Sequence, residues 1–310
     1  MTLRNLGSSG LQVSLVGLGC NNFGQRMDLE SSTKVIHRAL DAGITLFDAA
    51  DVYGGRGGSE TVLGQVLGER RKDIVLATKF AMPMDEGEKK GASRRYIVSA
   101  LEASLRRLKT DWIDLYQQHQ PDPLTPIEET LRALDDLVRA GKVCYVGCSN
   151  FTPAQVVEAQ WAARHLGLNA FVSCQDEYSL LRRALDKEAL PLMQRYGLGL
   201  LPYFPLASGL LTGKHKRGAA AAGTRLATAP FARFMADGNF DLVEKLEAFV
   251  KARGHSMVEL AFSWLAARPT VGSIIAGATK PEQIDANVKA TGWALSAEDL
   301  AEIDKITAAG

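Results

Sequence analysis

The chain reads ITLFD at residues 44–48, IVLATK at 74–79 and WIDLYQQH at 112–119, and these three segments decide the fold. Runs of aliphatic and β-branched residues of this length are typical of strands that are buried on both faces. Each segment ends in a residue able to do proton chemistry, namely an acid, an amine and an imidazole. In a parallel barrel the carboxyl ends of the strands surround the active site. We therefore expect the three side chains to point into one shared pocket.

Strand and helix patterns alternate along the chain, after a hairpin pattern over residues 3–14. Buried strands are predicted at 15–19, 44–48, 74–79, 112–118, 143–148, 170–175, 198–203 and 272–277. Amphipathic helices are predicted at 31–42, 59–68, 93–108, 126–140, 153–165, 186–196, 256–267 and 281–291. The alternation predicts an α/β fold, a (β/α)8 TIM barrel that spans residues 1–310 as a single domain. The hairpin and two extra helices, at 239–253 and 296–306, would be additions to it.

Two stretches fit the barrel pattern less well. Pro202 lies inside the strand predicted at 198–203, and proline cannot donate a ladder hydrogen bond. Residues 213–238 are interpreted as a long mobile loop. A doubly wound sheet is the competing architecture, but its dinucleotide fingerprint fails at the third glycine, where Asn22 stands.

Composition excludes several classes of function. The chain has 310 residues with 23% charged residues and a net charge of +1, which indicates neither a nucleic-acid surface nor a polybasic membrane patch. No apolar stretch is long enough to cross a bilayer, and the first residues do not resemble a signal peptide. The four cysteines lack the spacing of a metal site, so we predict no metal and interpret them as buried thiols of a cytoplasmic protein. They are Cys20, Cys144, Cys148 and Cys174.

Seven motifs occur together along the chain. They are DAADVYG at 48–54, SE-x-x-LG at 59–64, ATK at 77–79, DLYQQH at 114–119, GCSNF at 147–151, QDEYSL at 175–180 and YFPLASGLLTGK at 203–214. In this order and spacing they resemble the aldo-keto reductase family, in particular its NADP-dependent oxidoreductase branch related to potassium-channel β subunits. The resemblance covers essentially the whole chain and implies a nicotinamide-dependent carbonyl reductase.

The resemblance implies a catalytic tetrad of Asp48, Tyr53, Lys79 and His119, and each position holds the matching residue. Carbonyl reduction needs a proton at the developing alkoxide, and Tyr53 would be the general acid that supplies it. A free tyrosine has a pKa of about 10, which a neighbouring Lys79 would lower. Asp48 would keep the buried ammonium charged, and His119 would orient the carbonyl oxygen through a hydrogen bond.

Taken one at a time, these residues have more ordinary interpretations. A single acid usually caps a helix, a single lysine is usually solvated and a single histidine is usually structural. Their position at successive strand ends, with Tyr53 five residues after Asp48, favours catalysis. Asp51 and Asp122 have no such setting, and we interpret them as loop carboxylates.

The later strands would hold the nicotinamide. Ser149, Asn150 and Gln175 end two of these strands and can hydrogen-bond a carboxamide. For the first two, capping of the helix that starts at Pro153 is the alternative. By resemblance, Tyr203 would stack against the nicotinamide ring.

The phosphates would bind further along the chain. Backbone amides of residues 204–214 and the ammonium of Lys214 would surround the pyrophosphate, and free amides at 277–283 would suit a 2′-phosphate, with Asn287 at the adenine. The complete predicted set of cofactor contacts is Gly19, Cys20, Asn21, Asp48, Ser149, Asn150, Gln175, Tyr203, Phe204, Pro205, Leu206, Ser208, Gly209, Leu211, Lys214, Gly277, Thr279, Lys280, Gln283 and Asn287.

The segment after the last strand departs from much of the family. Many members carry basic residues where Gly277 and Gln283 stand and an acid where Ala286 stands, so Lys280 is the nearest cation on this segment. NADP is the favoured cofactor, with NAD as the alternative. The chain ends at Gly310, so the extended carboxyl-terminal loop of many reductases is expected to be short or absent, which leaves the substrate open.

The sequence therefore predicts a cytoplasmic oxidoreductase that reduces small aldehydes or ketones, sugar-like ones included, without binding nucleic acid or membrane. Three alternatives stay open: an NAD-dependent sugar or alcohol dehydrogenase, a redox-sensing module like the channel β subunits, and a Schiff-base aldolase with Lys79 as its nucleophile. Ion pairing with Asp48 argues against the aldolase, because it keeps the amine protonated. Physiological direction and oligomeric state are not predictable from these patterns.

Overall fold

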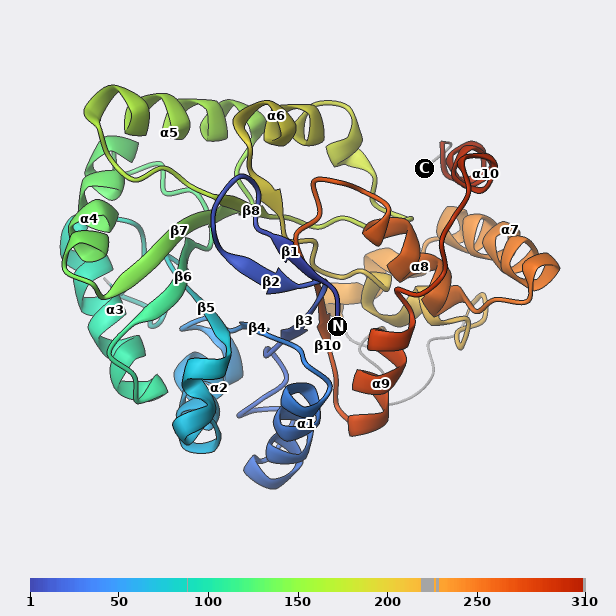
Figure 1. Ribbon diagram of the computed structural model, residues 1–310, viewed down its shortest axis with the longest axis horizontal. Helices are drawn as coiled ribbons and strands as arrows, with labels where there is room; N and C mark the ends of the chain where they lie inside the picture. Colours follow the sequence, from blue (N-terminus) through green and yellow to red (C-terminus); the bar gives the residue numbers. More distant parts are fainter. Residues whose placement is uncertain (88, 219–225, 227–228, 309–310) are drawn as a thin grey trace.

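The computed structural model describes residues 1–87, 89–218, 226 and 229–308. An eight-stranded parallel sheet forms the centre, in the order β10-β3-β4-β5-β6-β7-β8-β9 (Figure 1). Its strands are β3 (Val16–Gly19), β4 (Leu46–Asp48), β5 (Val75–Phe80), β6 (Ile113–Gln118), β7 (Val143–Ser149), β8 (Ser173–Gln175), β9 (Gly199–Leu200) and β10 (Ile274–Gly277). This order confirms the predicted barrel, because each strand lies beside its neighbour in the chain.

The barrel closes between β9 and the segment that leads into β10. Leu200 forms a parallel bridge with Val271, and the Ile275 amide donates to the carbonyl of Pro202. The strand predicted at 198–203 is much shorter than expected, with Gly199–Leu200 alone in regular geometry. Pro202 explains this difference, since it has no amide hydrogen for the ladder but still supplies an acceptor.

A hairpin covers the amino-terminal end of the barrel. Its strands are β1 (Leu3–Asn5) and β2 (Gln12–Ser14), and Figure 1 shows them across the barrel opening. Leu6 and Val13 of this hairpin pack against barrel-interior side chains such as Leu46 and Leu115. The hairpin therefore closes this end, and the carboxyl ends of the strands lie at the opposite one.

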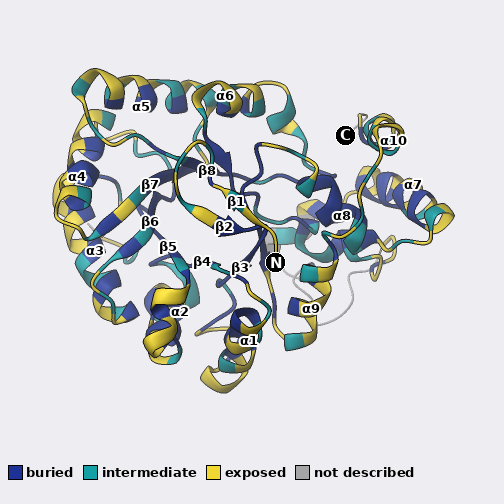
Figure 2. Cartoon of the chain, in the orientation of Figure 1, coloured by how far each residue is buried: buried dark blue, intermediate teal, exposed yellow. Residues whose placement is uncertain are grey.

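Helices surround the barrel and each buries one face in the core (Figure 2). They are α1 (Leu29–Asp41), α2 (Tyr53–Val66), α3 (Arg94–Leu108), α4 (Ile127–Arg139), α5 (Pro153–Leu166), α6 (Ala189–Tyr196), α7 (Asp237–Arg253), α8 (Met257–Ala266), α9 (Pro281–Lys289) and α10 (Ala297–Thr307). The two predicted extra helices are α7 and α10, which lie outside this ring, where α7 packs against α8 and α10 (Figure 2). No helix among the described residues is long and apolar enough to cross a membrane.

The segment predicted as a long loop, 213–238, is partly structured. Residues Ala229–Met235 form a 3-10 helix, η5, which packs against η3 (Ala207–Thr212). Residues 219–225 and 227–228, which include the alanine run, lie outside the described residues. Arg217 is held by ion pairs to Asp237, Asp241 and Glu244, and these contacts fix the described start of the segment to α7.

The cysteines differ from expectation at one position. Cys20, Cys148 and Cys174 are buried, but Cys144 is exposed on β7. Cys148 and Cys174 are register partners on neighbouring strands, with their sulfur atoms 3.7 Å apart. The strand pattern placed Cys144 correctly in a strand but not on the right face.

Candidate active site

Lys79 lies at the centre of a buried polar network. Its Nζ donates to Asp48 Oδ2 at 2.7 Å, to the Ala49 carbonyl at 2.8 Å and to the Tyr53 hydroxyl at 3.3 Å. The Lys79 side chain is fully buried and that of Asp48 is almost so. A buried ammonium is costly unless it is paired and hydrogen-bonded, and here all three of its donors have acceptors. The strand ends thus bring together the acid and the amine that the sequence singled out.

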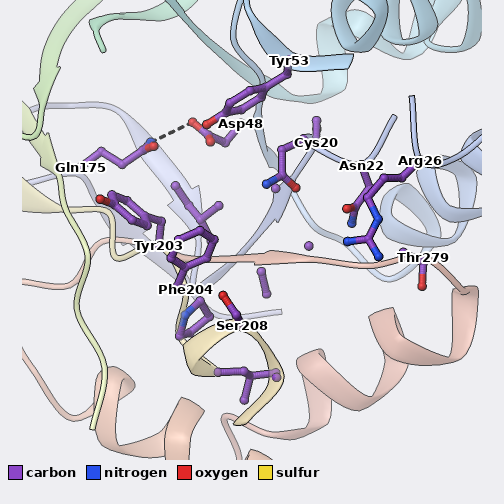
Figure 3. A pocket seen from close by; sticks show the side chains of 18 of the residues that line it. Cys20, Asn22, Arg26, Asp48, Tyr53, Gln175, Tyr203, Phe204, Ser208 and Thr279 are labelled. Atoms are coloured by element: carbon purple, nitrogen blue, oxygen red, sulfur yellow. Dashed lines mark hydrogen bonds between the residues drawn. The ribbon is translucent and has the colours of Figure 1, made fainter. Parts of the chain in front are cut away.

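Carboxamides fix the second oxygen of Asp48. Gln175 Nε2 donates to Asp48 Oδ1 at 2.8 Å (Figure 3). Gln117 Nε2 donates to the same oxygen at 3.4 Å. Because both carboxylate oxygens are engaged, Asp48 has a single orientation toward Lys79.

A left-handed turn positions Tyr53. Although α2 begins at this residue, φ is positive at Gly54, Gly55, Arg56 and Gly57, so the regular helix starts only afterwards. At Gly54 a Cβ atom would collide with backbone atoms of neighbouring residues, so glycine is required there. This glycine-rich turn holds the Tyr53 phenol over the ends of the strands, within reach of Lys79.

Charge and burial act in opposite directions on these groups. Burial raises the pKa of Tyr53 above its ordinary value, and Lys79 counteracts only part of this rise. Burial alone would lower the pKa of Lys79, but Asp48 and Tyr53 raise it above its ordinary value. Lys79 does lower the pKa of Tyr53, as expected, but burial raises it by more. Tyr53 therefore holds its proton at neutral pH, beside a lysine that stays charged.

His119 completes the polar group on the opposite side of Tyr53. The two rings meet edge to face, with their centroids 5.6 Å apart. Burial, and then the charge of Lys79, hold the pKa of His119 well below its ordinary value, so the imidazole is neutral at pH 7. Its buried Nδ1 has no hydrogen-bond partner among the described residues. A neutral imidazole can donate one hydrogen bond without competing with Tyr53 as the acid.

A cavity of about 600 Å³ opens in front of this network. Most predicted site residues line it: Gly19, Cys20, Asn21, Asp48, Tyr53, His119, Ser149, Asn150, Gln175, Tyr203, Phe204, Pro205, Leu206, Ser208, Gly209, Gly277, Thr279 and Gln283. Five do not: Lys79, which lies behind Asp48 and Tyr53, and Leu211, Lys214, Lys280 and Asn287. Leu211 and Asn287 are buried, whereas the two lysines are exposed.

Sequence reasoning missed five lining residues, which are Asn22, Arg26, Thr212, Ile275 and Ala276. Ile275 and Ala276 lie within β10, and Asn22 and Arg26 lie in the loop after β3. Their position near the carboxyl ends of the first and last barrel strands is the signal that could have identified them.

The amides after β7 and β8 are tied to one another. Ser149 Oγ donates to the Gln175 carbonyl at 2.7 Å, and Asn150 Nδ2 donates to the His119 carbonyl at 3.0 Å. The Tyr203 hydroxyl donates to Asn150 Oδ1 at 2.8 Å, which fixes the ring of Tyr203. Helix α5 is capped by Thr152, so the capping alternative for Ser149 and Asn150 does not hold.

The start of α9 differs from expectation. Gln283 Oε1 accepts from the amide of Thr279 at 2.7 Å and from that of Lys280 at 3.3 Å. The sequence had suggested that these two amides are free, but Gln283 occupies both. An anion at this position would have to displace the Gln283 side chain or use other donors.

The family follows from comparison with known proteins. A family model described as "Aldo/keto reductase family" matches residues 15–308. The chain belongs to this family. It is 39% identical over 299 residues to the "Probable voltage-gated potassium channel subunit beta" of Oryza sativa subsp. japonica, covering 94% of this chain and 91% of that protein.

Two bacterial relatives widen the comparison. The chain is 37% identical over 312 residues to the "Uncharacterized oxidoreductase YrpG" of Bacillus subtilis, covering 97% of this chain and 94% of that protein. It is 34% identical over 330 residues to the "L-glyceraldehyde 3-phosphate reductase" of Escherichia coli, covering 100% of this chain and 93% of that protein. The chain is thus an oxidoreductase by family, and members typically use nicotinamide cofactors.

The residues present fit such a cofactor. The cavity has the volume of a site for a sizeable organic ligand. The buried Ser208 Oγ on its wall has no hydrogen-bond partner among the described residues, as expected of a donor that awaits a ligand. Tyr203 presents an aromatic surface beside the carboxamides of Asn150 and Gln175. Within the described part of the chain, no group of three or more acidic, histidine or cysteine side chains could hold a metal ion.

A second buried acid lies close to the network. Asp51 is only 1% exposed, and neither carboxylate oxygen has a hydrogen-bond partner among the described residues. Burial and the nearby Glu60 raise the pKa of Asp51 to about 8. Its interpretation as a loop carboxylate was therefore incomplete, because at neutral pH it is mostly a buried neutral acid.

Proposed function

We propose that the protein is an NADPH-dependent aldo-keto reductase that reduces aldehydes and ketones, sugar-like ones included, to alcohols. One observation carries this proposal: the buried Lys79 ammonium donates to both Asp48 and the Tyr53 hydroxyl at the wall of a cofactor-sized cavity. This arrangement supports proton transfer by a tyrosine. Packing alone does not require it, because apolar side chains of similar volume can replace a buried ion pair without loss of stability.

The proposed reaction assigns one task to each polar side chain. A bound nicotinamide would supply the hydride to the carbonyl carbon. Tyr53 would give its hydroxyl proton to the carbonyl oxygen, and Lys79 would stabilise the resulting phenolate. His119 would donate a hydrogen bond to the same oxygen and so orient the substrate. Asp48 would hold the charge of Lys79 through the cycle.

The residues after β7, β8 and β9 would fix the cofactor. Gln175 commits its side-chain nitrogen Nε2 to Asp48, which leaves its side-chain oxygen Oε1 to accept from a carboxamide. Ser149 Oγ keeps its acceptor capacity after donating to the Gln175 carbonyl. Tyr203, held by Asn150, would stack against the ring.

The proposal is tested by fluorescence titration of the protein with NADPH and NADH separately, followed by a panel of aldehydes, ketones and sugars with the cofactor that binds better. We expect tighter binding of NADPH and robust turnover of generic aldehydes. Absence of binding by either cofactor would refute the proposal. Tighter binding of NADH, with alcohol oxidation, would favour a dehydrogenase instead.

Two other functions make different predictions in the same assays. The similarity to a plant protein named as a probable channel β subunit favours a slow redox-sensing module as the second candidate. Tight NADPH binding with only slow turnover of the whole panel would support it. A Schiff-base aldolase requires an unprotonated Lys79, which its ion pair with Asp48 opposes. Borohydride trapping of a substrate adduct on Lys79 would reverse this choice.

A further inference from the structure

Arg26 is a cationic side chain on the wall of the cavity that no motif identified. It lies in the loop between β3 and α1 and is exposed. Backbone hydrogen bonds across this loop, from Gly24 to Met27 and from Met27 to Asn22, give it a fixed shape. Figure 3 shows Arg26 beside Asn22, on the side of the cavity where Thr279 lies.

No other lysine or arginine among the described residues lines this cavity. Lys214 and Lys280, the two cations expected from the sequence, are exposed and lie outside its lining. Arg217 is paired with three acids of α7. Arg26, in contrast, forms no ion pair or hydrogen bond in the described part of the chain. Its guanidinium is therefore available to an anion in the cavity.

The start of α9 makes such a donor necessary. Gln283 occupies the amides of Thr279 and Lys280, as described above. A phosphate beside Thr279 would thus lack these two backbone donors, which a helix start normally offers to an anion. A guanidinium could replace them, because it presents several N–H groups in a planar fork that matches phosphate oxygens.

We propose that Arg26 binds the 2′-phosphate of NADP(H) and is the main source of the preference for this cofactor over NAD(H). The assignment rests on the proposed function, since it presumes a nicotinamide dinucleotide in the cavity. The 2′-phosphate is favoured over the pyrophosphate by position: Arg26 is grouped with Thr279 in Figure 3, whereas Ser208, the unpartnered hydroxyl on the wall, lies between them and Tyr203.

The test compares dissociation constants of the parent and of Arg26→Gln for four ligands: NADPH, NADH, 2′,5′-ADP and ADP. Removal of one charge-assisted contact should weaken binding by about ten- to a hundred-fold. We expect this loss for NADPH and 2′,5′-ADP, with NADH and ADP changed by less than about two-fold. Arg26→Lys should restore part of the affinity, because it returns the charge without the fork.

The control is Arg132→Gln, which removes an exposed arginine of α4 that lies outside the cavity lining. It should leave all four dissociation constants unchanged, and thermal melting should show that both variants remain folded. An equal loss for NADPH and NADH would place Arg26 at the pyrophosphate and overturn the inference, as would no loss at all. In either case a parent that binds NADPH and reduces aldehydes would leave the proposed function intact. A parent that binds neither cofactor would refute both.

Discussion

The two ends of the cavity are built on opposite principles. At the strand ends, Lys79, Asp48 and Gln175 are buried and bonded to one another. At the start of α9, Thr279 and Lys280 are exposed, and their amides are satisfied by Gln283. The hydrogen bonds of the first end are complete without a ligand, whereas at the second end an anion would have to displace Gln283 or bind to exposed side chains. The chemistry is therefore preorganised, and the selection of the cofactor depends on a few exposed side chains.

The largest effect is expected at the buried end, from removal of the acid. Tyr53→Phe deletes one hydroxyl, and the loss of a positioned general acid typically lowers the rate by about a hundred- to ten-thousand-fold. NADPH should bind with nearly normal affinity, because the proposed phosphate contacts lie at the other end of the cavity. Single-turnover kinetics together with NADPH titration measure both. A variant that retained more than about a tenth of the rate would require another proton donor.

Removal of the Lys79 charge should lower the rate about as much as Tyr53→Phe does, and should also change the pH dependence of the rate. Lys79→Met takes away the cation that partly offsets the effect of burial on Tyr53, so the pKa of the phenol rises further. Alcohol oxidation needs the phenolate, and its alkaline limb should therefore move to higher pH.

This variant leaves Asp48 as an unpaired buried charge, which can cost about 3–5 kcal/mol of stability. The double variant Asp48→Asn, Lys79→Met removes both charges and serves as the control. An alkaline limb that stays in place in both folded variants would show that Lys79 does not tune Tyr53. The buried end would then be a structural network only.

The same contrast explains what the sequence could predict. Buried strands have apolar patterns, and parallel strand ends converge, so the approach of Lys79 to Asp48 and Tyr53 followed from the chain alone. Lengths were less predictable: β9 is short because Pro202 interrupts its ladder, and Cys144 faces outward although it lies in a strand.

The exposed end was harder to predict, because its geometry depends on side-chain choices that leave no periodic signal. Nothing in the pattern indicates that Gln283 turns back onto the amides before it. Arg26 lies in a loop, and its place on the cavity wall follows from the shape of that loop. Asp51 was missed for a related reason, since a polar residue in the irregular segment after a strand gives no sign of its burial.

Asp51 lies in the same buried region as Asp48 but has no ion pair among the described residues, so it tests how an unpaired acid affects stability there. Its folded pKa of about 8 lies above the unfolded value of about 3.9. Between these values the folded state binds more protons than the unfolded state, so the free energy of unfolding falls as pH rises through this window. Asp51→Asn should remove this dependence and make the protein about 2–5 kcal/mol more stable than the parent at pH 9.

Denaturant unfolding from pH 4 to pH 9 measures this effect. The charged groups that act on Asp51 are Glu60, Arg107 and Lys79, and all three remain in the variant. Asp122→Asn is the matched control. Hydrogen bonds lower the pKa of Asp122 despite opposing burial, so this substitution should lower the free energy of unfolding by a constant amount at neutral and alkaline pH and change its pH dependence only at acid pH. Parallel pH profiles for the parent and Asp51→Asn would show that the buried acid is paired in solution.

The smallest effect is expected at the exposed end, from Lys280→Ala. The sequence indicated Lys280 as the nearest cation for a 2′-phosphate, but its side chain is exposed and outside the cavity lining. Exposed charge pairs contribute at most about 1 kcal/mol and are screened by salt, which corresponds to less than about five-fold in affinity. NADPH should weaken by no more than this at low salt, and NADH should be unaffected. Titrations at about 20 and 150 mM salt would show the small effect disappear. A selective ten-fold or larger loss of NADPH affinity at the higher salt would instead make Lys280 the main phosphate contact. Cofactor choice would then depend on the exposed start of α9 and not on the loop that carries Arg26.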